Sequence, residues 1–82
     1  MQSLQQAVTE QFNAIVASIQ YAEGADHMKN ADELIRFAEP VWICAGFPEL
    51  IAEIKNKFSD TLERHYAAAT TKKERLQLDM LR

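Results

Sequence analysis

Glycine and proline are scarce in this chain, and their scarcity limits the folds that it can adopt. Only two of each occur among the 82 residues. Strand-rich domains need many tight turns, and glycine and proline build most of those turns. The chain is rich instead in Ala, Gln, Glu, Leu and Lys, which are good helix formers. We therefore predict one all-α domain over residues 1–82, made of a few long helices.

The first expected helix spans about residues 3–23. Ser3 is a suitable N-cap, and Gln6 stands three residues later, as in a capping box. Gly24 stands where the C′ glycine of a helix is expected. Between these signals the apolar residues recur at steps of three or four, as in an amphipathic helix: Leu4, Val8, Phe12, Ile15, Ile19 and Ala22.

A second helix is expected over about residues 30–45. Asn30 can cap its start, with Glu33 at the capping-box position. Residues 24–30 then form either a polar connection or an extra helical turn. Pro40 either ends or kinks the helix, because it lacks the backbone N–H, or it opens a new helical turn.

An uninterrupted run of apolar residues, Val41–Phe47, follows Pro40. We favour a helix here over a strand, because a single strand would find no partner elsewhere in the chain. A helix that is apolar on all sides must be buried on more than one of them. Gly46 is expected to cap the end of this helix, and Pro48 to open the next one.

The third expected helix spans residues 48–69, and two interpretations of residues 70–81 are open. One interpretation is a single long helix. The other is a break at residues 70–71, with Thr71 capping a short helix and Glu74 completing a capping box. We favour the continuous helix, because no glycine or proline interrupts the segment. The helices together predict a small antiparallel bundle of three to four helices with short loops.

No catalytic, cofactor-binding or metal site is predicted. His27, His65 and Cys44 form none of the close pairs that zinc sites use. Cys44 stands between Ile43 and Ala45, and a cysteine among apolar neighbours usually behaves as a small hydrophobe. Two glycines cannot build a glycine-rich phosphate loop. We therefore expect a protein that is not an enzyme and that needs no cofactor.

The cysteine count and the apolar runs favour a cytoplasmic protein, and the net charge of −3 makes it acidic. A single cysteine excludes an internal disulfide, which fits a reducing compartment. The sequence begins without the pattern of a secretion signal, and no apolar run is long enough to span a bilayer. We accordingly expect no membrane partner.

Basic residues near the C-terminus offer a DNA-binding alternative. Lys72, Lys73 and Arg75 would suit a small dimeric transcriptional regulator with a basic C-terminal helix. However, Glu74 and Asp79 share the segment, and the net charge of −3 disfavours nucleic acid. Cations near the C-terminus of a helix are explained more simply by the helix dipole.

A protein-binding surface is the function class that we favour. A domain this small leaves much apolar surface in water, and a partner is one remedy. Trp42 is the only tryptophan, and tryptophan is enriched at interaction hot spots, although it could equally fill the core of the bundle. The residues that we expect to contact the partner lie in two segments: Val41, Trp42, Phe47, Leu76, Met80 and Leu81.

These expectations combine into one hypothesis about function. We expect a homodimeric regulator or adaptor that occupies the surface of a partner protein of unknown identity. Short helical chains of this kind are frequent among phage-encoded or mobile-element regulators and among secretion chaperones, which is a base rate and not a match.

Overall fold

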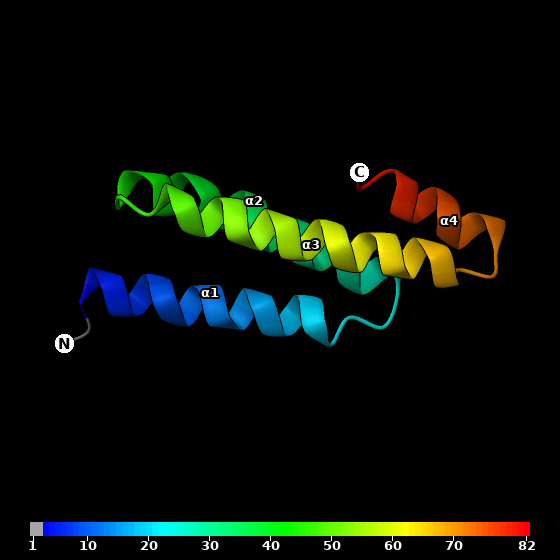
Figure 1. Cartoon of the computed structure of the whole chain (residues 1–82), viewed down its shortest axis with the longest axis horizontal. Coiled ribbons are helices and arrows are strands. Elements are labelled where there is room, and N and C mark those ends of the chain that lie inside the picture. The colour runs from blue at the N-terminus through cyan, green and yellow to red at the C-terminus, as the bar shows by residue number, and fades with distance from the viewer. Residues whose placement is uncertain (1–2) are drawn as a thin grey trace.

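Four helices joined by short connections make up the chain (Figure 1). The computed structural model describes residues 3–82. The helices are α1 (Leu4–Gln20), α2 (Ala25–Cys44), α3 (Pro48–Ala68) and α4 (Lys72–Asp79). No strand occurs in the described range, so the predicted all-α bundle is confirmed.

The first three helices pack against one another along their lengths, with α2 antiparallel to both α1 and α3 (Figure 1). Helix α4 folds back over α3 and the start of α2 and does not touch α1. The molecule is elongated, with extents of 46 × 18 × 16 Å. Its core runs between the helices and is entirely apolar among residues 3–82: Val8, Ile15, Ile19, Ala25, Met28, Ala31, Ile35, Ala38, Trp42, Ile51, Ile54, Phe58, Leu62, Ala69 and Leu78.

The start of α1 is capped as predicted, but its end differs. The Ser3 hydroxyl accepts a hydrogen bond from the Gln6 N–H at 3.1 Å, and the Gln6 side chain accepts one from the Ser3 N–H at 3.0 Å. The helix ends at Gln20, earlier than expected. Gly24 has an extended backbone with φ of −176° and is the N-cap of α2, so its predicted role as C′ glycine is wrong.

Helix α2 begins at Ala25, so Asn30 is not its N-cap. The extra helical turn, which was one of two alternatives for residues 24–30, is the correct one. The physical reason is burial: Ala25 and Met28 extend the core stripe of α2 by one turn when they are helical. Asn30 is exposed within the helix.

Pro40 lies inside α2 without ending it, and the helix continues to Cys44. A proline in a helix deprives the carbonyl four residues earlier of its N–H partner. That carbonyl belongs to Arg36, and both Arg36 and Pro40 are exposed, so water can satisfy it. Pro40 therefore neither ends α2 nor opens a new helix, and α2 ends close to its predicted end.

The turn between α2 and α3 confirms the predicted roles of Gly46 and Pro48. Gly46 has φ of +91°, a conformation that glycine adopts without strain. The Phe47 N–H donates to the Trp42 carbonyl at 2.9 Å, and the Gly46 N–H to the Ile43 carbonyl at 3.1 Å. These two hydrogen bonds form a Schellman motif, which closes α2. Pro48 then occupies the first turn of α3.

The favoured continuous helix over residues 48–81 is wrong, and the break with Thr71 as the N-cap is correct. Helix α3 ends at Ala68, and the Thr71 hydroxyl caps α4 by accepting from the Glu74 N–H at 3.2 Å. The reversal buries Leu78 completely and Leu81 in part, which a straight helix would leave in water. Sequence propensity around Thr71 is too weak to oppose that gain.

Candidate functional site

Trp42 lies in the core, so its predicted place on a partner surface is wrong. Its side chain is fully buried, and its ring packs against Phe12 with the centroids 6.0 Å apart. The indole Nε1–H donates to Gln11 Oε1 at 2.7 Å, so its one polar group is satisfied within the chain. A large apolar ring with a paired N–H is more stable inside the bundle than in water.

Phe47 and Leu81 are also poor contact residues. Both are partly buried and pack against the core, one after the end of α2 and the other after α4. Because their apolar surface is already covered in part, a partner would gain little from them. The prediction that they form part of a contact surface is therefore not supported by their placement.

Three of the predicted contact residues are exposed. Val41 on α2 is 48% exposed, Leu76 on α4 is 62% exposed, and Met80, the C-cap of α4, is 79% exposed. Leu76 lies four residues before Met80, and the only buried residue of α4 is Leu78. The structure thus separates the predicted set into core residues and two small exposed groups on different helices.

Val41 belongs to an exposed apolar stripe on α2 that the sequence analysis missed. We call Leu34, Phe37 and Val41 the α2 stripe. Their spacing of three and four residues places them on one face of the helix. Leu34 is 38% exposed and Phe37 is 74% exposed, so the helix presents this face to solvent.

A second apolar stripe runs along α2 beside the exposed one, and this doubling is the signal that the sequence offered. Ile35, Ala38 and Trp42 repeat the same spacing one residue further along and are all buried. One residue is a rotation of about 100° in an α-helix. Two interleaved apolar stripes therefore run along α2, and only one of them can face the core. Sequence alone does not say which of the two does so.

The basic residues of the DNA-binding alternative all lie on the short helix α4. Lys72 and Lys73 are exposed and lie in the first turn of α4. The dipole explanation offered for them is wrong, because a cation at this end of a helix is disfavoured. Arg75 instead supports the connection before α4, since its Nε–H donates to the Ala69 carbonyl at 3.3 Å.

The C-terminus is held to α3 by a charged contact. Arg82 donates to Glu63 Oε1 at 2.6 Å, and its guanidinium lies 4.6 Å from the centre of the Tyr66 ring. The hydrogen bond to Glu63 is the main cause that raises the pKa of Arg82 above its usual value. Arg82 is thus occupied within the chain.

Over residues 3–82, no group of three or more potential metal ligands comes together. None of the described helices is both long enough and apolar enough to cross a bilayer. No protein-family model matches the chain, and no curated protein or solved structure is similar enough to count as a match.

Proposed function

We propose that this chain is a small non-enzymatic regulator or adaptor that binds another protein through the α2 stripe. The observation that carries the proposal is Phe37, a large apolar side chain that is 74% exposed between two aliphatic neighbours. A single exposed apolar residue needs no explanation, but a contiguous group of them often marks an interaction site.

The stripe has the form of a helix-in-groove anchor. Leu34 and Val41 are seven residues apart, which is about 10 Å along a helix. Amphipathic helices that dock into apolar grooves use anchors at this spacing. Full burial of a side chain such as Phe37 contributes roughly 1.5–3 kcal/mol, so three neighbouring side chains provide a compact hot spot.

A second copy of the chain is the simplest partner for such a stripe, and homodimerisation is part of the proposal. Apolar residues at alternating steps of three and four are the pattern by which helices pair. Sedimentation at micromolar concentration tests this part. A species of twice 9.4 kDa is expected for the wild type, and a monomer for Phe37→Ser. A monomeric wild type would rule out homodimerisation and leave a different protein as the partner of the α2 stripe.

The partner itself is tested by affinity capture from the native host. Phe37→Ser should lose the captured protein, whereas Tyr21→Ser should retain it. Tyr21 is a matched control, because it is 73% exposed but lies in the connection after α1. Neither substitution removes core packing, so both variants should fold. Equal recovery by the two variants would show that the α2 stripe is not the binding surface.

DNA binding by a dimer remains a second candidate, supported by Lys72 and Lys73. Both side chains are exposed, and neither forms an ion pair with any residue in the described part of the chain. A gel shift at low salt is the test, because electrostatic binding is strongest there. Binding that disappears in Lys72→Gln/Lys73→Gln supports this function, and absence of binding by the wild type excludes it.

A further inference from the structure

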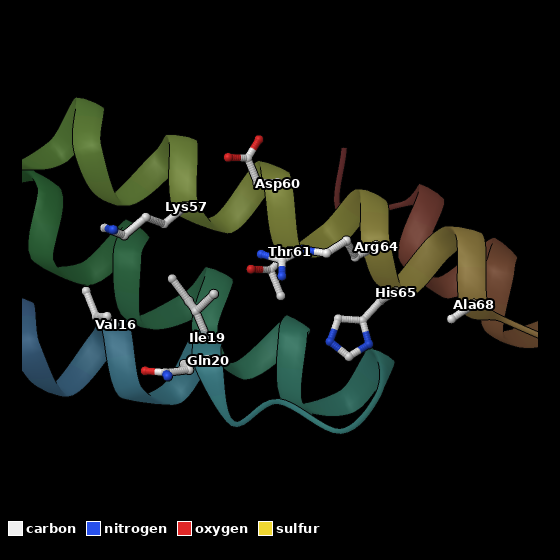
Figure 2. Close-up of a pocket in the computed structure, with 9 residues that line it drawn as sticks. All are labelled: Val16, Ile19, Gln20, Lys57, Asp60, Thr61, Arg64, His65 and Ala68. Carbon is white, nitrogen blue, oxygen red and sulfur yellow. The ribbon is translucent and has the colours of Figure 1, made fainter.

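A groove of about 630 Å³ lies between α1 and α3 (Figure 2). Residues of α2 and α4 take no part in its lining, so it is distinct from the α2 stripe. Val16 and Ile19 form its apolar side on α1. Lys57, Arg64 and His65 on α3 form the other side.

Two cations of the groove form no ion pair among residues 3–82. Lys57 and Arg64 form no ion pair, whereas Arg36, Lys55 and Arg82 each pair with a carboxylate. Figure 2 shows the one carboxylate of the lining, Asp60, projecting from α3 away from α1. With two cations against one carboxylate and His65 neutral, the lining of the groove carries a net charge of +1 beside an apolar side.

The spacing of these cations suits a helical ligand. Lys57 and Arg64 are seven residues apart on α3, so they share a face and are separated by about 10 Å along the axis. A helix lying parallel or antiparallel to α3 would present carboxylates at the same interval if its acidic residues were also seven apart. Apolar residues one turn from these carboxylates would then lie near Val16.

The shape of the groove argues for a peptide and against a small molecule. Sites for small molecules enclose most of the ligand surface, whereas this groove is open to solvent. An added helix packed between α1 and α3 would cover the open side with ordinary helix-to-helix spacing of about 8–10 Å. Charge on α3 and apolar surface on α1 would fix which face of that helix turns inward.

We propose that the groove between α1 and α3 binds an acidic amphipathic helix of another protein. Lys57 and Arg64 pair with two carboxylates that lie two turns apart on the ligand, and an apolar side chain between them packs on Val16. This inference does not depend on the α2 stripe, because the two surfaces share no residue.

The test uses a fluorescent, alanine-rich helical peptide with two glutamates seven residues apart and two leucines between them. Anisotropy at low salt should show saturable binding, and methyl NMR signals of Val16 and Ile19 should shift. Lys57→Gln/Arg64→Gln should weaken binding roughly tenfold, the effect of two exposed ion pairs of ordinary strength. Lys72→Gln/Lys73→Gln, which changes the net charge equally, should bind like the wild type.

Several results would overturn the proposal. They are absence of peptide binding, equal binding of a peptide with glutamines in place of the glutamates, and equal weakening by both double variants. If succinate at the same concentration as the peptide displaced the peptide completely, the groove would be a site for small anions and not for a helix. Phe37→Ser should bind the peptide normally, so failure of this inference and failure of the α2 stripe are distinguishable.

Discussion

Replacing Leu78 by alanine tests how α4 is held against the rest of the fold. Leu78 is fully buried and is the only buried residue of α4. A leucine-to-alanine change in a core costs roughly 2–5 kcal/mol, and the cost rises with the cavity that remains. A domain of 82 residues has a free energy of unfolding of about 4–12 kcal/mol at typical values per residue. This one substitution should therefore remove a large share of the stability.

The loss of stability caused by Leu78→Ala has an upper bound, because α4 can detach on its own. Helix α4 has eight residues, and an isolated helix of that length is marginal in water. If α4 detaches while the other three helices stay folded, the measured loss cannot exceed the free energy that holds α4 in place. Hydrogen exchange separates the two cases, because local detachment exposes the amides of α4 and leaves those of α2 protected.

The matched control is Leu76→Ala, which is the same chemical change two residues away. Leu76 is 62% exposed, so its replacement should change stability by no more than about 0.5 kcal/mol. Urea unfolding followed by circular dichroism measures both variants. Equal losses for Leu76→Ala and Leu78→Ala would refute the argument that α4 docks through one buried side chain.

Three further predictions concern the caps and the core. Thr71→Ala removes the hydroxyl that caps α4 and should cost about 1 kcal/mol in urea unfolding, while Thr70→Ala, which removes no cap, should cost less than half of that. Gly46→Ala forces a side chain into φ of +91° and should cost roughly 1–2 kcal/mol, whereas Gly24→Ala, at an extended backbone, should not destabilise by as much; similar losses would contradict the role of φ. Trp42 is fully buried, so its fluorescence should be blue-shifted and protected from acrylamide, and quenching like that of free tryptophan would place it on the surface.

The helix ends show what local sequence can predict. Ser3, Gly46 and Pro48 act on backbone groups within five residues of themselves, so their roles are readable from the chain alone. Thr71 was recognisable as a cap by the same reasoning. The preference for a continuous helix nevertheless failed, because the choice depended on where Leu78 could be buried.

The candidate sites were less predictable, because exposure depends on residues far away in the sequence. Leu34 and Ile35 are adjacent and equally apolar, yet only Ile35 is buried. Trp42 has the composition of a hot spot, but Phe12 and Gln11 on another helix hold it in the core. The groove beside Lys57 is lined by residues of α1 and α3, and no local sequence pattern predicts that these two helices are neighbours.

The sequence by itself determined the all-α class, the caps at Ser3 and Gly46 and the periodic apolar stripes, because these follow from backbone propensity and short-range hydrogen bonds. Only the tertiary structure decided which stripe of α2 faces water and where the C-terminal segment turns back. The physical reason is that burial is a property of packed neighbours. It therefore cannot be assigned to a residue until the helices around that residue are in place.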